Sequence, residues 1–120
     1  YGCTLCCLSM MVGKSPIEVN KILVKAGAFF GANGDLMDDN IAARALGLNY
    51  FGKEFDINKM PNWTPSLKEV DFSPHPGKQQ HFVLRARTSN GKLCIIDPWG
   101  GVCRTLNYYK FVSYRNFKVK

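Results

Sequence analysis

Three residues that lie far apart in this 120-residue sequence have the types needed for nucleophilic catalysis by a thiol: Cys3, His81 and Asp97. A cysteine nucleophile reacts as its thiolate, and the unpaired amides and dipole of a helix N-terminus lower the pKa of a thiol placed there. Cys3 begins a predicted helix and follows Gly2, a residue that lets the backbone turn tightly. A histidine must then accept and return the proton, while a third side chain holds the histidine ring.

The chain has two histidines, and His81 is the better candidate for the base. His75 lies between two prolines in a predicted loop, whereas His81 begins a predicted strand, which holds a side chain rigidly. Asp97 ends the next predicted strand, and the Asn90-Gly91 pair between the two strands is a strong hairpin signal. Because the start of one hairpin strand lies opposite the end of the other, we expect His81 and Asp97 to be neighbours.

Helices are predicted in the first part of the chain. Cys3–Val12 is apolar on nearly all sides, which is typical of a helix buried in the centre of a domain. Ser15–Glu18 supplies an N-cap, a first-turn proline and a capping-box glutamate for a second helix that ends at Gly27. Asp35–Leu46 contains a third helix with acidic residues in its first turn.

Strands are predicted in the second part. Leu48–Phe51 is expected to be a short strand, and Leu67–Phe72 an edge strand in a proline-rich region. The remaining strand-like segments are His81–Arg87, Lys92–Asp97, Val102–Leu106 and Phe111–Val119. We expect the aromatic residues near the end of the chain, Tyr108, Tyr109, Phe111, Tyr114 and Phe117, to pack the sheet. This separation of helices from strands predicts an α+β fold, with N-terminal helices packed on a C-terminal antiparallel sheet.

The five cysteines are Cys3, Cys6, Cys7, Cys94 and Cys103. A domain of this size does not need disulfides, so we expect a reduced chain, or one in which at least one thiol is kept free. We interpret all of them except Cys3 as small core residues, although a disulfide between Cys94 and Cys103 across adjacent strands stays open. A zinc site built on Cys3-x-x-Cys6 is the weaker alternative, because that pair lies in an apolar helix. No metal and no cofactor is expected.

The segments that carry these residues resemble those of a known group of enzymes. Gly2–Met11 (GCTLCCLSMM) resembles the opening helix of the bacteriocin-leader (double-glycine) processing peptidases, which are papain-like. His81–Leu84 (HFVL) is similar to the histidine strand of that group, and Ile95–Gly100 (IIDPWG) to its Asp-Pro motif. The resemblance covers most of the chain and leaves about Tyr50–Lys78 unanchored.

The resemblance implies a papain-like cysteine peptidase in which Cys3 is the nucleophile, His81 the general base and Asp97 the residue that orients the base. The implied substrate is a peptide, either a leader sequence or a cell-wall peptide. The implied setting is a bacterial surface or phage tail protein with neighbouring domains, located at the cell surface, secreted or in a virion.

The alternative function is a catalytically inactive binding or structural module with the same fold. That alternative is favoured by Thr4-Leu5, which stands where the group usually has Gly-Pro after its nucleophile. The group also carries a glutamine shortly before the nucleophile that helps to bind the oxyanion, and only two residues precede Cys3 here. Because the chain begins with Tyr1 rather than Met, we expect it to be a processed product or a piece of a longer protein.

Composition and charge argue against several other classes of protein. A hydrophobic content of 46% supports one folded domain over residues 1–120 rather than disorder. The net charge of +7 is scattered along the sequence without a nucleic-acid-binding motif, so we expect no nucleic-acid partner. No apolar run has the roughly 18–20 residues needed to cross a bilayer, and no secretory signal is visible.

Overall fold

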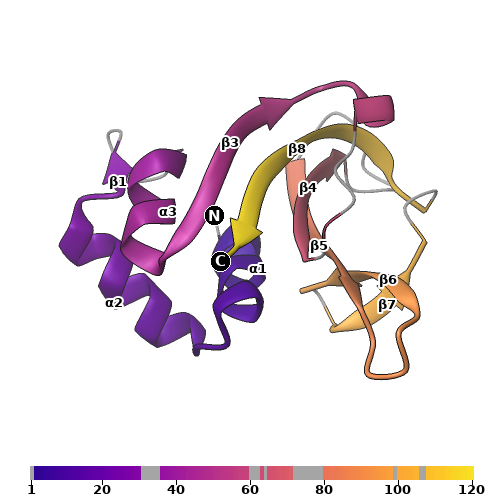
Figure 1. Cartoon of the computed structure of the whole chain (residues 1–120), viewed down its shortest axis with the longest axis horizontal. Coiled ribbons are helices and arrows are strands. Elements are labelled where there is room, and N and C mark those ends of the chain that lie inside the picture. Colours follow the sequence, from indigo (N-terminus) through magenta and orange to yellow (C-terminus); the bar gives the residue numbers. More distant parts are fainter. Residues whose placement is uncertain are drawn as a thin grey trace.

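Helices gather on one side of the molecule and a six-stranded antiparallel sheet on the other, as Figure 1 shows. This computed structural model describes residues 2–30, 36–59, 63, 65–71, 80–98, 100–105 and 108–120. The α+β fold class expected from the sequence is therefore confirmed. Among the described helices, none is long and apolar enough to cross a membrane.

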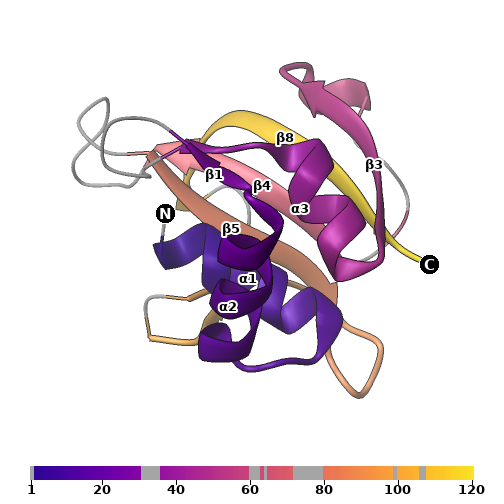
Figure 2. The same cartoon turned by 90° about the vertical axis from the view of Figure 1, so that its left-hand side faces the viewer.

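The first helix, α1 (Gly2–Val12), lies between α2 (Pro16–Ala26) and the sheet strand β5 (Gln80–Arg87), as Figures 1 and 2 show. Its largest buried side chain, Leu8, is fully shielded from solvent. Even its polar residue Ser9 is buried, and the Ser9 hydroxyl donates a hydrogen bond to the Leu5 carbonyl at 2.7 Å. Most of this helix is thus buried, as expected of a helix that is apolar on nearly all sides, but Met10 is 41% exposed.

Capping residues define the two outer helices, α2 (Pro16–Ala26) and α3 (Asp39–Leu46). The Ser15 hydroxyl accepts a hydrogen bond from the Glu18 amide at 3.2 Å, which confirms the predicted start of α2. The third helix lies within the expected range Asp35–Leu46, and it starts after its N-cap Asp38, whose side chain accepts a hydrogen bond from the Ile41 amide at 3.0 Å. Asp35 itself lies outside the described residues.

Gly27 and Gly47 end these two helices in the left-handed conformation, with φ of 74° and 71°. This conformation has almost no steric cost for glycine, and the amide of each residue caps carbonyls of the last helical turn. Two short strands, β1 (Phe29–Phe30) and β2 (Leu36–Met37), pair between α2 and α3.

The six strands of the main sheet follow the spatial order β3-β8-β4-β5-β6-β7, and every neighbouring pair is antiparallel. Their bounds are β3 (Leu48–Glu54), β4 (Ser66–Asp71), β5 (Gln80–Arg87), β6 (Leu93–Asp97), β7 (Val102–Arg104) and β8 (Lys110–Val119). A short 3-10 helix, η1 (Ile57–Lys59), follows β3.

The expectation of an edge strand at Leu67–Phe72 is wrong. The strand found there, β4, pairs with β5 on one side and with β8 on the other, so it lies inside the sheet. The physical reason is that the last strand of the chain returns between β3 and β4, a pairing that local sequence patterns do not reveal. Phe72 lies outside the described residues, as does Leu106 of the expected strand Val102–Leu106.

The two faces of β5 contact different clusters of side chains. Leu84 belongs to the main core, together with Leu8 of α1, Leu23 of α2 and Phe117 of β8. Val83 belongs to a second, smaller cluster with Ile95 and Tyr109. Since successive strand residues point to opposite faces, His81 shares the face of Val83 and of this smaller cluster.

Candidate active site

The hairpin of β5 and β6 brings His81 and Asp97 together, as the sequence predicted. The pairing includes Leu84 opposite Ile96, so the same register places Asp97 opposite Val83, two residues from His81 on the same face. The imidazole Nε2 of His81 lies 2.7 Å from Oδ1 of Asp97. Both side chains are almost fully buried, with exposed fractions of 1% and 2%. A short hydrogen bond that is shielded from solvent fixes the orientation of the His81 ring.

The other oxygen of the Asp97 carboxylate is held by a residue that the sequence analysis assigned only to packing. The hydroxyl of Tyr109 donates a short hydrogen bond to Oδ2 of Asp97. Burial, together with this contact to a carboxylate, raises the pKa of Tyr109, so the hydroxyl stays a donor. Tyr109 therefore takes part in positioning the acid, and no local sequence signal distinguished it from the neighbouring Tyr108.

Cys3 lies in the first turn of α1, near enough to the imidazole of His81 for each group to shift the pKa of the other. The thiol is only partly exposed, and this burial opposes ionisation. Hydrogen bonds from His81 and from the backbone of Phe82, together with the charge of the imidazole, outweigh burial and lower the pKa of Cys3. A hydrogen bond that favours the thiolate must be donated to the sulfur, so the donor from Phe82 is its amide.

The same interaction shifts the pKa of His81 in the opposite direction, upward. Burial favours neutral imidazole, but the hydrogen bonds with Cys3 and Asp97 and the negative charges of both residues raise the pKa of His81. A lowered thiol pKa beside a raised imidazole pKa favours the thiolate-imidazolium pair over the neutral pair. The structure thus brings together all three residues selected from the sequence, Cys3, His81 and Asp97.

The place where β5 and β6 separate explains why α1 reaches this site. Their ladder runs from the Arg87–Leu93 pair to the Leu84–Ile96 pair, and Phe82 lies just beyond it. There the Phe82 carbonyl accepts a hydrogen bond from Sγ of Cys7 at 3.6 Å, while the Phe82 amide contacts Cys3. A thiol of α1 therefore satisfies a carbonyl of β5 beyond the end of the ladder.

The remaining two thiols of α1 differ from each other. Cys7 is fully buried in the main core, as expected, and burial raises its pKa well above the ordinary value of a thiol. Cys6 was also expected in the core, but it is partly exposed because its side of α1 faces a cavity. This part of the prediction for the cysteines is wrong.

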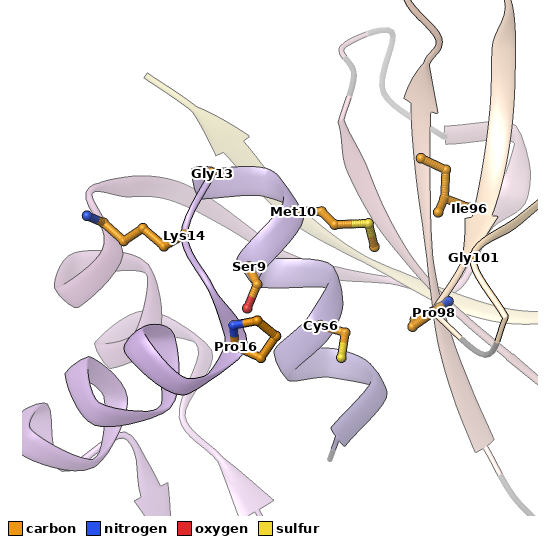
Figure 3. A pocket seen from close by; sticks show the side chains of 9 residues that line it. All are labelled: Cys6, Ser9, Met10, Gly13, Lys14, Pro16, Ile96, Pro98 and Gly101. Carbon is orange, nitrogen blue, oxygen red and sulfur yellow. The ribbon is translucent and has the colours of Figure 1, made fainter.

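The cavity beside Cys6 has a volume of about 420 Å³ and is lined mainly by apolar groups. In Figure 3, Cys6 and Met10 point from α1 toward Pro98 and Ile96 on the opposite wall. Pro98 directly follows Asp97, and Cys6 lies one helical turn after Cys3. The cavity therefore begins next to the cluster of Cys3, His81 and Asp97.

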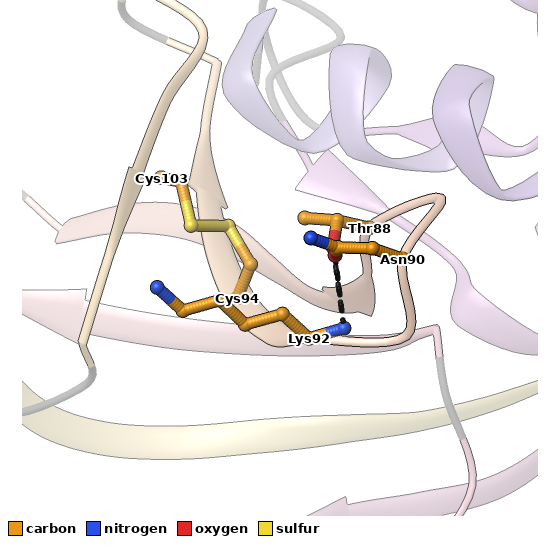
Figure 4. The surroundings of a disulfide bond; sticks show 5 residues. All are labelled: Thr88, Asn90, Lys92, Cys94 and Cys103. Atoms are coloured by element: carbon orange, nitrogen blue, oxygen red, sulfur yellow. Dashed lines mark hydrogen bonds between the residues drawn. A yellow bond between two sulfur atoms is a disulfide. The ribbon is translucent and has the colours of Figure 1, made fainter.

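Cys94 and Cys103 form a disulfide (Figure 4). Cys94 is buried, as expected of a core residue, but Cys103 is exposed, so its interpretation as a small core residue is wrong. They lie on the adjacent strands β6 and β7, where Ile96 pairs with Cys103 and brings Cys94 within 5.5 Å of it between Cα atoms. The chain is therefore not fully reduced, and three of its cysteines are free thiols. This disulfide also removes both residues as zinc ligands. Among the described residues, no group of three or more metal-ligating side chains is found.

Comparison with protein families, with curated proteins and with solved structures finds no match for this chain. Its function must therefore be argued from the geometry of the cluster formed by Cys3, His81 and Asp97. His75, the other histidine considered, and Trp99 of the Ile95–Gly100 segment lie outside the described residues.

Proposed function

We propose that this chain is a cysteine peptidase with a papain-like fold, in which Cys3, His81 and Asp97 form the catalytic triad. The observation that carries the proposal is the position of the His81 ring. Its Nε2 lies 2.7 Å from a buried carboxylate, and the ring interacts with the thiol in the first turn of α1, so that the pKa of the imidazole is raised. A nucleophile, a base and a group that orients the base are thus linked in the order that covalent catalysis requires.

The chemistry follows from which ring nitrogen each partner uses. Oδ1 of Asp97 accepts a hydrogen bond from Nε2 of His81. The other ring nitrogen, Nδ1, therefore exchanges the proton with the Cys3 thiol. The thiolate attacks the carbonyl carbon of a peptide bond, and the Nδ1 proton moves to the leaving amine. Water then attacks the resulting thioester with His81 as base, which releases the acid and restores the thiol.

The position of Cys3 in the first turn of α1 suits the charge that develops on the substrate. The first amides of a helix have no partner within the helix and point toward its N-terminus. Such amides stabilise an oxyanion formed on a carbonyl that Cys3 attacks. The contribution of one donor of this kind is about 100- to 1000-fold in rate.

The cavity beside Cys6 favours a peptide with an apolar side chain close to the cleaved bond. Its walls come from α1 and from the turn after Asp97, the same two elements that position Cys3 and Asp97. Leader peptides and cell-wall peptides remain the substrate classes that the sequence resemblance implies. A bacterial surface, secreted or virion-associated protein with further domains is the corresponding setting, and the net charge of +7 suits an anionic envelope.

The proposal is tested by incubating the protein with a diverse peptide library and identifying new peptide termini by mass spectrometry. We expect products that disappear in Cys3→Ala and His81→Ala and persist in Tyr108→Phe, which changes an exposed side chain outside the triad and the cavity. A thioester between Cys3 and the acyl part of the substrate, trapped at low pH, is the expected intermediate.

The alternative, an inactive binding module, predicts a different result in the same samples. It requires that no product depends on Cys3 and that Cys3 reacts with iodoacetamide at mildly acidic pH no faster than Cys6 does. Rapid alkylation of Cys3 without hydrolysis of any peptide would mean that the ion pair exists but that the protein is not a peptidase.

A further inference from the structure

The first two turns of α1 carry two partly exposed free thiols, Cys3 and Cys6, in a Cys-x-x-Cys arrangement. In an α-helix, residues three positions apart lie on the same face with about 5–6 Å between their Cβ atoms. A Cys-x-x-Cys pair at a helix N-terminus is the arrangement that thiol–disulfide enzymes use for reversible redox chemistry. The proposed peptidase mechanism uses the Cys3 thiol and gives the Cys6 thiol no chemical role.

We propose that Cys3 and Cys6 form a reversible disulfide when the protein meets a hydroperoxide. This pair is distinct from the Cys94–Cys103 disulfide, which lies on β6 and β7. The modification is a two-electron oxidation of a dithiol at the site where the proposed nucleophile lies. It requires no partner beyond the peroxide and, for reversal, a reducing thiol.

The reaction balances in two steps. The Cys3 thiolate attacks the O–O bond of the hydroperoxide, and the sulfur becomes a sulfenic acid while the peroxide is reduced to an alcohol, or to water for hydrogen peroxide. The Cys6 sulfur then attacks the Cys3 sulfur, the S–S bond forms, the S–O bond breaks, and the departing hydroxide takes the Cys6 proton as water. A dithiol reductant converts the Cys3–Cys6 disulfide back to two thiols by thiol–disulfide exchange.

Cys3 is suited to the first step because its surroundings favour the thiolate. It lies in the first turn of α1 beside His81 and the backbone of Phe82, and the interactions with both lower its pKa. A sulfur that is both ionised and reachable by solvent is the one that peroxide oxidises first. Its partial exposure meets the second condition.

Cys6 rather than Cys7 is suited to the second step. Cys7 is fully buried, its thiol donates to the Phe82 carbonyl at 3.6 Å, and burial raises its pKa. Cys6 instead faces the cavity between α1 and the turn at Pro98. A disulfide needs Cβ atoms about 3.5–4.5 Å apart, so the first turn must tighten by roughly 1–2 Å. The first turn of a helix adjusts most easily, because its amides lack partners within the helix.

The disulfide would draw the Cys3 sulfur away from His81 and so suspend hydrolysis. This consequence for activity rests on the proposed function, whereas formation of the disulfide does not. The two are separated by reading the bond directly from mass spectra instead of from peptide cleavage.

The experiment treats the full chain with an equimolar amount of hydrogen peroxide, unfolds it in guanidinium chloride so that the buried Cys7 can also react, alkylates the remaining thiols with iodoacetamide, and measures intact mass and fragment ions. We expect the number of alkylated thiols to fall from three to one, with the loss of two hydrogens from the protein mass. Fragment ions should place the single label on Cys7. Dithiothreitol at a concentration that leaves the Cys94–Cys103 bond intact should restore all three thiols.

Two variants make the assignment specific. Cys7→Ser should still lose both remaining thiols to the disulfide, because Cys7 takes no part in it. Cys6→Ser should instead stop at the sulfenic acid of Cys3 and, with more peroxide, proceed to the sulfinic acid, which dithiothreitol does not reverse.

The proposal is overturned if the label in the oxidised wild type lies on Cys6, or if Cys3 becomes sulfinic acid while Cys6 is still alkylated. Disulfide-linked dimers as the main product would also overturn it. The fragment ions of the wild type decide these outcomes even if a variant fails to fold.

Discussion

Removing one hydroxyl group, in Tyr109→Phe, tests whether Tyr109 supports the buried carboxylate of Asp97. The change keeps the aromatic ring, which is buried beside Val83 and Ile95, and deletes only the donor to Oδ2 of Asp97. Because Asp97 is 2% exposed, water cannot easily take the place of the lost hydroxyl. The hydrogen bond of His81 to Oδ1 stays in place.

The expected loss of stability follows from the charge on the acceptor. A hydrogen bond to a charged group contributes about 1.5–3 kcal/mol, and a buried acceptor that loses its donor costs a similar amount. We therefore expect Tyr109→Phe to lower the free energy of unfolding by about 2 kcal/mol. With a urea dependence of about 2 kcal/mol per molar, the unfolding midpoint falls by about 1 M.

Urea unfolding followed by tryptophan fluorescence measures this change, and Tyr108→Phe is the matched control. The ring of Tyr108 contacts the ring of Tyr109 at 5.0 Å between centroids, but Tyr108 is 46% exposed. Loss of a hydroxyl in so exposed a position should change the free energy by no more than about 0.5 kcal/mol. Equal midpoints for the two variants would refute the support that we assign to Tyr109.

Three further predictions concern the ion pair at the site, the disulfide and the N-cap of α3. In His81→Ala the Cys3 thiol loses a hydrogen bond and a positive charge that favour its ionisation, so its pKa rises. The rate of alkylation of Cys3 by iodoacetamide near pH 6 should then fall by about tenfold or more and recover above about pH 8.5, where an ordinary thiol ionises; an unchanged rate would exclude the ion pair. Replacing Cys94 and Cys103 together by alanine should cost about 2.5 kcal/mol for a closed loop with a sequence separation of 9. Only the wild type should lose stability when dithiothreitol is added to the urea titration. Asp38→Ala should cost about 1 kcal/mol by removing the N-cap of α3, while Asp38→Ser should retain most of that energy.

The pH dependence of the proposed peptidase follows from the same pair of shifts. Hydrolysis needs the Cys3 thiolate, which forms above the lowered pKa of this thiol, and the His81 imidazolium, which is lost above its raised pKa. Activity should therefore fall on the acid side as Cys3 is protonated and on the alkaline side as His81 loses its proton. The acid-side limit should therefore lie below the pKa of an ordinary thiol, and the alkaline-side limit above the pKa of an ordinary imidazole.

Local signals in the sequence were sufficient for the helices and for two members of the site. Ser15 and Gly27 bound α2 because caps act on neighbouring backbone groups, which sequence spacing shows directly. His81 and Asp97 were predicted as neighbours because only a short hairpin separates their strands. In each case the partners lie close in sequence, and elementary strand or helix geometry connects them.

Features that depend on distant segments were missed. The strand β4 was expected at an edge, but β8 lies between β3 and β4 and makes β4 an interior strand. The local sequence of β4 and that of β8 contain no signal that identifies the neighbouring strand. Tyr109 contacts Asp97 only because the chain returns past β7 before β8 begins. The Cys94–Cys103 disulfide stayed open for a similar reason, because it depends on the register between β6 and β7.

The contact between α1 and β5 is the one long-range feature on which the whole site depends. Hairpin geometry brings His81 to Asp97 but says nothing about Cys3, which lies 78 residues before His81 in the sequence. That distance is bridged because β6 separates from β5 after the Leu84–Ile96 pair and exposes the Phe82 backbone. The Cys7 thiol donates a hydrogen bond to the Phe82 carbonyl there at 3.6 Å, while Cys7 and Leu8 pack against Leu84 in the main core. Core packing together with this bond thus holds α1 against β5 in the position that brings its first thiol to the imidazole.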